Sequence, residues 1–179
     1  MDFYVLLILA VAVERLVELV VSKRNLVWAR SRGGREYGFG HYPFMVFLHT
    51  GLLVACVIEA SRRSFIPALG WPMFALVLLA QALRWLCITT LGPRWNTRIV
   101  VVPGLPLVDR GPYRWMRHPN YVAVVIEGIA LPLVHTAWIT AVVFTVVNAG
   151  LLRVRISAEN AALAEALAEA PPSSTRLPQ

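Results

Sequence analysis

The chain contains repeated apolar stretches long enough to cross a lipid bilayer, and this feature limits the folds open to it. A transmembrane helix needs about 20 mostly apolar residues to cross a hydrocarbon layer about 30 Å thick. Stretches of about this length lie at residues 2–21, 41–59, 68–90, 119–134 and 138–152. The sequence is 58% hydrophobic and 15% charged, whereas soluble domains carry about 25% charged residues. We therefore predict an all-α integral membrane protein with about five transmembrane helices.

The 179 residues fit one compact helical domain. We see no internal repeat and no linker, so we assign residues 1–170 to a single domain. The composition of PPSSTRLPQ predicts a disordered tail at 171–179. Cys56 and Cys87 fall within apolar stretches, without a Cys-x-x-Cys motif or a cluster of Cys and His. The sequence therefore predicts neither a disulfide framework nor a metal site.

The formal net charge of +7 does not indicate nucleic-acid binding, because the basic residues alternate with apolar stretches instead of forming one continuous stripe. Membrane topology explains their distribution better. Basic residues cluster at 23–35, 94–117 and 153–155, whereas Arg62 and Arg63 lie between the second and third stretches. By the positive-inside rule, the three clusters face the cytoplasm and the N-terminus lies outside.

Charged residues inside the predicted membrane helices have a structural or a functional reason, since charges are costly in a bilayer. In the first helix, Glu14 and Glu18 share a face, and Arg15 can pair with Glu18. This group is predicted either to join helices by internal ion pairs or to form a polar wall of a substrate pocket. Further along, Glu127 is predicted either to form a hydrogen bond between helices or to face the substrate, and Arg84 is predicted to extend toward the lipid headgroups.

A long loop at residues 91–117 separates the third and fourth helices. Loops of this length within a compact domain are usually functional. Its segments 99–102 and 105–108 flank Pro103-Gly104, which predicts a short β-like hairpin. We expect this hairpin to lie over the cytoplasmic face of the membrane and to cover a cofactor.

A basic and aromatic motif, GPYRWMRHPNYVAVVIE at residues 111–127, leads from this loop into the fourth helix. Proline suits the first turn of a helix, which explains Pro119, but no structural requirement explains the arginine and histidine before it. The last two helices form a hairpin that returns to the same membrane face. The segment RISAENAAL after the hairpin is therefore predicted to lie beside His118, and we interpret the motif as the entrance of an active site.

The motif GPYRWMRHPNY, followed by an apolar hairpin and RISAENAAL, resembles the isoprenylcysteine carboxyl methyltransferase family of integral membrane methyltransferases. The resemblance covers residues 91–163, the predicted catalytic part. Upstream, ERLVELVVSKRN and GREYGFGHYPFMVFLH resemble a bacterial branch of this family that is associated with type III polyketide synthases. The resemblance implies an enzyme of the bacterial inner membrane whose active site faces the cytoplasm.

The resemblance also implies S-adenosylmethionine as the cofactor and a lipid-like substrate that enters from the membrane. Catalysis would rest on Arg155 and Glu159, where cofactor and substrate meet. The family often has two consecutive acidic residues where this chain has Glu159-Asn160. Aromatic faces and carboxylates favour a sulfonium, and Tyr113 is one aromatic candidate. The other residues implied for the cofactor site are Arg117, His118, Pro119, Tyr121, Glu159 and Asn160.

The methyl acceptor stays open between two chemistries. A carboxylate, as in a prenylcysteine, would be held by Arg155. A phenol or enol, as in an alkylresorcinol or alkylpyrone, needs a base, for which the candidates are His118, His41, Glu14 and Glu18. Two other classes of protein are alternatives: an NADPH-dependent membrane reductase of the sterol-reductase type, and a non-catalytic membrane scaffold or transporter.

Overall fold

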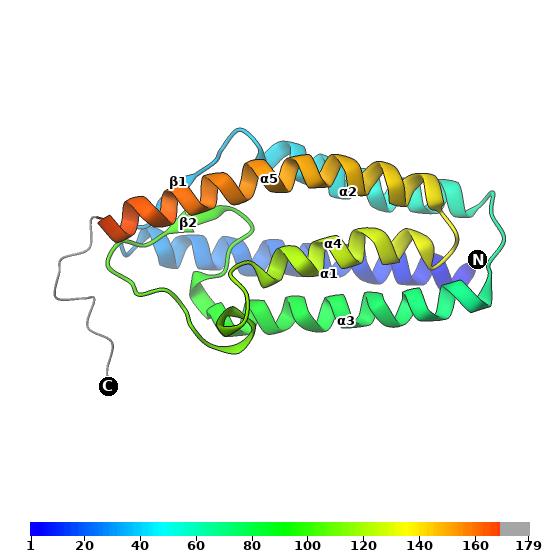
Figure 1. Cartoon of the computed structure of the whole chain (residues 1–179), viewed down its shortest axis with the longest axis horizontal. Coiled ribbons are helices and arrows are strands. Elements are labelled where there is room, and N and C mark those ends of the chain that lie inside the picture. Colours follow the sequence, from blue (N-terminus) through cyan, green and yellow to red (C-terminus); the bar gives the residue numbers. More distant parts are fainter. Residues whose placement is uncertain (169–179) are drawn as a thin grey trace.

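A computed structural model describes residues 1–168 as a bundle of five long helices with a small two-stranded sheet at one end (Figure 1). The helices are α1 (Asp2–Arg30), α2 (Tyr42–Ala60), α3 (Pro67–Leu91), α4 (Pro119–Leu133) and α5 (Trp138–Ala168). The strands are β1 (Arg35–Tyr37) and β2 (Ile99–Val101). Two 3-10 turns, η1 (Gly92–Arg94) and η2 (Gly111–Arg114), lie in the loop between α3 and α4. The tail predicted at 171–179 lies outside the described residues.

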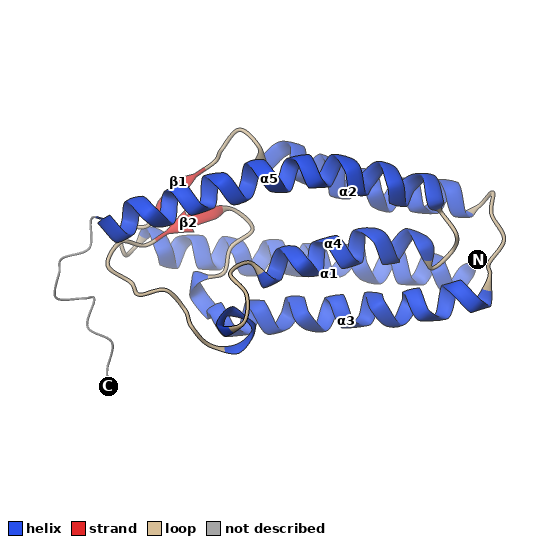
Figure 2. Ribbon diagram, viewed as in Figure 1, coloured by secondary structure: helices blue, strands red, loops and turns tan. Residues whose placement is uncertain are grey.

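The helices run along the long axis of the molecule, and its two ends differ (Figure 2). The N-terminus, the α2–α3 connection and the α4–α5 connection lie at one end. The two strands, the long loop and the last turns of α5 lie at the other, which we call the sheet end. The segments that carry the predicted site therefore all reach the sheet end.

Three helices of the described chain are long and apolar enough to cross a membrane, at Tyr42–Ala60, Pro67–Arg94 and Trp138–Ala166. α4 is apolar but has 15 residues, which gives about 22 Å of helix at a rise of about 1.5 Å per residue. α1 has 29 residues and carries charges in its middle part. These findings fit an all-α membrane protein with three helices of full membrane length.

α1 does not end at Val21, where the apolar stretch ends, but continues to Arg30. The residues that follow Val21, SKRNLVWAR, contain no proline or glycine that would stop a helix. The basic residues after Val21 therefore continue α1 beyond its apolar stretch, toward the sheet end.

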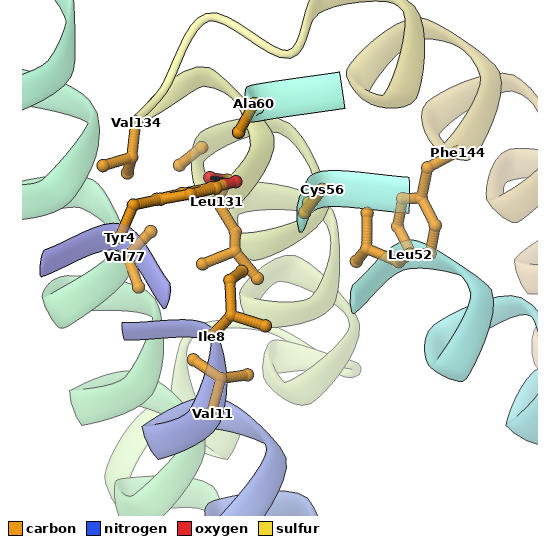
Figure 3. Close-up of a cluster of buried hydrophobic side chains, with 11 residues drawn as sticks. Tyr4, Ile8, Val11, Leu52, Cys56, Ala60, Val77, Leu131, Val134 and Phe144 are labelled. Atoms are coloured by element: carbon orange, nitrogen blue, oxygen red, sulfur yellow. Dashed lines mark hydrogen bonds between the residues drawn. The ribbon is translucent and has the colours of Figure 1, made fainter. Parts of the chain in front are cut away.

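A cluster of buried apolar side chains joins the helices in the half of the bundle that contains the N-terminus (Figure 3). The Tyr4 hydroxyl donates a 3.0 Å hydrogen bond to the Leu131 carbonyl, which joins α1 to α4. The side chains of the cluster come from α1, α2, α3, α4 and α5 and include Ile8, Val11, Leu52, Cys56, Val77, Val134 and Phe144. This core holds the five helices together near the N-terminus. The polar side chains of the predicted site lie nearer the sheet end.

The predicted hairpin within the long loop is wrong. Strand β2 pairs instead with β1 in an antiparallel register, with Glu36 opposite Val100. Residues 105–108 form no strand in the described chain. Pro103 and Pro106 have no N–H group to donate, so this part of the loop is a poor partner for a ladder. The loop is therefore joined to the segment after α1.

We predict that Gly128→Ala destabilises the contact between α4 and α5. A methyl group at Gly128 would lie 2.2 Å from Phe144 Cε1, and the Phe144 ring is buried in the core. Overpacking of this kind costs about 1–3 kcal/mol, so the thermal unfolding midpoint in detergent should fall by several degrees. Gly150→Ala on α5 is the control, because a methyl group there meets no atom within 4 Å. Equal midpoints for the two variants would contradict the packing described here.

Candidate active site

Tyr121, on the first turn of α4, lies between two charged side chains of α5 at the sheet end. Its hydroxyl donates a 2.5 Å hydrogen bond to Glu159 Oε2 and accepts a 2.8 Å bond from Arg155 Nε. The guanidinium carbon of Arg155 also lies 5.6 Å from the centre of the Tyr121 ring. Arg155 and Glu159 share a helix face because they are four residues apart. The hydroxyl therefore links a guanidinium and a carboxylate across the α4–α5 hairpin.

His118, immediately before α4, packs against the same group. Its ring is stacked on that of Tyr121, with centres 5.4 Å apart and planes at 26°. Its Nδ1 lies 3.6 Å from Glu159 Oε2, and its Nε2 lies 3.2 Å from Asn160 Oδ1. The Glu159 side chain is 31% exposed, and Asn160 is exposed. This edge of the cluster is therefore accessible from solvent.

Arg155 is held on its other side by the long loop and α2. Its Nη2 donates a 2.7 Å hydrogen bond to the Thr97 carbonyl, and its Nη1 lies 3.2 Å from the Met45 sulfur. Thr97 is itself fixed, because its N–H donates a 3.1 Å bond to Ser22 Oγ of α1. Arg155 is buried, so its charge is confined to one position where α2, α4, α5 and the loop meet.

The remaining residues predicted for a cofactor site lie at or just before the start of α4. Tyr113 is half-buried on η2, and burial, with a smaller effect of its contact with Cys87, raises the pKa of its phenol. Pro119 is buried at the first turn of α4 and marks its beginning. Arg117 is exposed. Tyr113 and Arg117 thus belong to the loop, whereas Pro119 positions Tyr121.

A small cavity of about 150 Å³ lies on one side of Arg155, beside the sheet, and His41 lines it. Arg98 and Glu36 of β1 also line it and form an ion pair of 2.5 Å. Partial burial, followed by the positive charge of Arg155, lowers the pKa of the His41 imidazole. His41 is therefore kept neutral to lower pH than a free histidine.

Arg155 also lines a larger cavity of about 350 Å³. It begins at Tyr121 and Arg155 and is enclosed by α1, α2 and α4 toward the middle of the bundle. Leu16 of α1 and Val46 of α2 line it, although they are 62% and 43% exposed. The cavity therefore opens sideways between α1 and α2, toward the apolar surroundings of the bundle.

Ion pairs line the deep part of this large cavity. Arg15 Nη1 lies 3.0 Å from Glu18 Oε2, and Arg15 Nη2 lies 3.5 Å from Glu127 Oε2. Arg84 pairs with Glu127 and lies 3.6 Å from Glu18 Oε1. The predicted headgroup position of Arg84 is wrong, because these two carboxylates hold it inside the bundle, where it is 4% exposed. The hydrogen bond between helices predicted for Glu127 is confirmed by its bond from Arg84.

Glu14 and Glu18, predicted together as substrate residues, have different surroundings. Glu14 accepts hydrogen bonds from Gln81 and, at 2.6 Å, from Trp85 Nε1, both on α3. Glu18 is buried and lines the large cavity. Glu14 therefore joins α1 to α3, whereas Glu18 faces the space between α1 and α4.

Sequence reasoning missed Thr97 and Met45 as partners of Arg155. Thr97 acts through its backbone carbonyl, and no pattern of side chains reveals such a role. Asn120 belongs to the motif interpreted as the entrance of an active site, and it lines the large cavity. The pairing of Arg84 was also detectable, because an arginine and several carboxylates occur inside the apolar stretches.

A family model described as the isoprenylcysteine carboxyl methyltransferase (ICMT) family matches residues 73–165. The chain belongs to this family. It is 39% identical over 161 residues to the uncharacterized protein YpbQ of Bacillus subtilis (strain 168), across 89% of this chain and 96% of the relative. It is 26% identical over 151 residues to an uncharacterized protein of Haemophilus influenzae, across 83% and 88%. No solved structure matches the chain significantly.

Membership of the isoprenylcysteine carboxyl methyltransferase family indicates a membrane methyltransferase, and S-adenosylmethionine is the general methyl donor of the family. The described cluster fits this cofactor chemically. A sulfonium is stabilised by a carboxylate and by aromatic faces, and Glu159 lies within 3.6 Å of the His118 imidazole and bonds to the Tyr121 hydroxyl. The accessible edge at Asn160 leaves this group open to a ligand from solvent.

We predict that Arg155→Gln raises the pKa of His41 toward its ordinary value, because the guanidinium charge disfavours a second positive charge beside it. His41 should then take up a proton at higher pH than in the unchanged protein. An NMR titration of the imidazole C–H signals measures this directly. Arg153→Gln, at an exposed position on the same helix, should leave the titration unchanged. Identical His41 curves in the Arg155 variant and the unchanged protein would contradict the proximity of the two side chains.

Proposed function

We propose that the protein is an S-adenosylmethionine-dependent O-methyltransferase that acts on a lipid-like acceptor within the membrane. The observation that carries this proposal is the Tyr121 hydroxyl, which bonds to Arg155 and Glu159 where a solvent-accessible cluster meets a cavity that opens sideways. A reaction between a water-soluble donor and a membrane-embedded acceptor requires such a junction. Proximity and alignment of the two reactants would then supply much of the rate enhancement.

On the solvent-accessible side, the Glu159 carboxylate would lie next to the cofactor. When bound, S-adenosylmethionine supplies a methyl group on a positively charged sulfur. Glu159 favours that charge. The His118 ring and the Arg155 guanidinium already pack against the Tyr121 ring, so Tyr121 would act through the hydrogen bond of its hydroxyl to Glu159. The loop before α4 would cover the ligand and exclude water. The further residues proposed to contact the cofactor are Tyr113, Arg117, Pro119 and Asn160.

On the membrane side, Arg155 would bind the acceptor oxygen. A guanidinium has five N–H donors, and Arg155 uses three of them on Tyr121, Thr97 and Met45. The others are available to an oxygen in the large cavity, which Arg155 lines. A buried cation favours the anionic form of that oxygen, which is the nucleophilic form. In this proposal Arg155 binds the acceptor oxygen and Glu159 binds the methyl donor. The Tyr121 hydroxyl lies between these two side chains and bonds to both.

The proposed acceptors are a prenylcysteine-like carboxylate and the phenolic or enolic hydroxyl of an alkylresorcinol or alkylpyrone polyketide. A carboxylate reaches the site ionised and needs the cation alone. A phenol or enol must first lose a proton. His41 is one candidate: its lowered pKa keeps the ring able to accept a proton, and it would act on an acceptor whose hydroxyl reaches the small cavity beside Arg155. His118 is the second candidate, from the cofactor side.

We further propose that α1 and α4 complete five membrane spans in a single domain of residues 1–170. The sheet end would face the cytoplasm of a bacterial inner membrane. Its segments carry most of the basic residues, including Arg94, Arg110, Arg114 and Arg153, whereas Arg62 and Arg63 follow α2 at the opposite end. The positive-inside rule favours this orientation.

We expect calorimetric titration of the detergent-solubilised protein to show binding of S-adenosylmethionine and S-adenosylhomocysteine, but not of NADPH. The cluster offers the carboxylate and aromatic faces that a sulfonium favours. Methyl transfer from labelled cofactor to lipid acids and lipid phenols would then identify the acceptor chemistry. Binding of NADPH alone would replace the proposal with a reductase, and binding of none of the three would favour a scaffold or transporter.

We also predict that Glu159→Gln weakens S-adenosylmethionine binding about tenfold or more and lowers methyl transfer in parallel. The substitution keeps the size of the side chain but removes a charge that contributes about 1.5–3 kcal/mol through hydrogen bonds. Glu165→Gln is the matched control, because Glu165 lies on the same helix with its side chain 50% exposed. Unchanged affinity in Glu159→Gln, with normal binding by the control, would remove Glu159 from the cofactor site.

A further inference from the structure

Buried polar atoms without a hydrogen-bond partner gather at the large cavity. Within residues 1–168, such side-chain atoms occur in Arg15, Glu18, Arg84, Trp95, Asn120 and His135. All of these residues except His135 line the large cavity. Buried polar atoms are nearly always hydrogen-bonded, and each exception needs an explanation. Because these unpaired atoms belong to residues that line one cavity, we expect a polar group of a ligand to bind there.

The atoms at the deep end are positioned for one particular kind of group. Arg84 Nε and Glu18 Oε1 both lack a hydrogen-bond partner among the described residues and lie 3.6 Å apart, too far for a direct bond. Both residues are 4% exposed. Arg15 Nε, on the same network, is a further unpaired donor. A hydroxyl can donate to the carboxylate and accept from a guanidinium at the same time.

The charge of the network argues against an anionic group at this end. Its two guanidiniums, from Arg15 and Arg84, already pair with three carboxyl groups, from Glu14, Glu18 and Glu127. No surplus cation is left in this network to neutralise a further carboxylate. A neutral hydroxyl adds no charge and supplies the missing hydrogen bonds.

The deep end is also well separated from the proposed reaction centre. Glu127 lies six residues after Tyr121 on α4, about 9 Å along the helix axis at about 1.5 Å per residue. Both residues line the same cavity. A single acceptor molecule can therefore contact both, with its apolar chain leaving between Leu16 and Val46.

We propose that Arg15, Glu18 and Arg84 form a second polar subsite, which binds a neutral hydroxyl of the acceptor about 9 Å from the oxygen that is methylated. This proposal rests on the proposed function, because it assigns the other end of the acceptor to Arg155. The acceptor class is then an amphiphile with two separated polar groups. A lipid with one polar end and a wholly apolar chain leaves the subsite atoms unpaired.

Two isomeric probes test the subsite: 8-hydroxyhexadecanoic acid and 2-hydroxyhexadecanoic acid. They have the same composition and carboxylate, but only the first carries its hydroxyl at about the required distance. We expect the purified protein in detergent to bind the 8-hydroxy isomer about tenfold more tightly, measured by quenching of tryptophan fluorescence or by calorimetry. Equal affinities, or no binding of either isomer, would overturn the proposal.

Variants show which residues cause the preference. Glu18→Gln, which keeps the side-chain shape, should reduce the preference to about threefold or less. Arg84→Lys, which keeps the positive charge and removes Nε, should reduce it similarly. Gln81→Met is the control, because Gln81 bonds to Glu14 and Arg15 in the same network but does not line the cavity. A preference retained in both Glu18→Gln and Arg84→Lys, or lost equally in the control, would also overturn the subsite.

Methyl transfer to the same two isomers, measured in parallel, separates this proposal from the proposed function. Preferential binding of the 8-hydroxy isomer without methyl transfer to either isomer supports the subsite and counts against a methyltransferase that accepts carboxylates. Methyl transfer to both isomers with equal affinity supports the methyltransferase and rejects the subsite.

Discussion

Charges inside a bilayer are stable only when they are paired, and the pairing of Arg84 with Glu127 satisfies this constraint for α3 and α4. Arg15 and Glu18 extend the same network to α1. Because these residues lie in three different helices, the network determines how the helices face one another. It also lines the deep end of the large cavity. The arrangement that stabilises the bundle thus produces a polar surface inside the membrane.

The two ends of the bundle are stabilised in different ways. Apolar packing around Tyr4 and Leu131 holds the helices at the N-terminal end. At the sheet end, hydrogen bonds position the polar side chains: Ser22 Oγ accepts a bond from the Thr97 N–H, and the Thr97 carbonyl accepts one from Arg155. Positioning a buried cation through a backbone carbonyl gives it little freedom to move. Such preorganisation would suit the proposed active site, because a positioned charge needs no rearrangement during a reaction.

The sequence predicted the helices well because apolar length is a local property. The hairpin of α4 and α5 was predicted within one residue at the turn, and Pro119 marked the start of α4 as expected. The predicted β-hairpin failed because strand pairing depends on which segments meet in space. The motif around Pro119 predicted His118 and Tyr121 as site residues from local sequence, whereas the partners of Arg155 lie on α2 and on the distant loop.

The sequence alone therefore determined the order of the helices, the membrane length of three of the five predicted spans and the identity of the residues in the motif, since these depend on composition and short-range spacing. Tertiary structure decided which charges pair, where the two cavities lie and that Tyr121 bonds to both Arg155 and Glu159. Those features join residues far apart in the chain. Their geometry follows from how whole helices pack, and no local pattern contains that information.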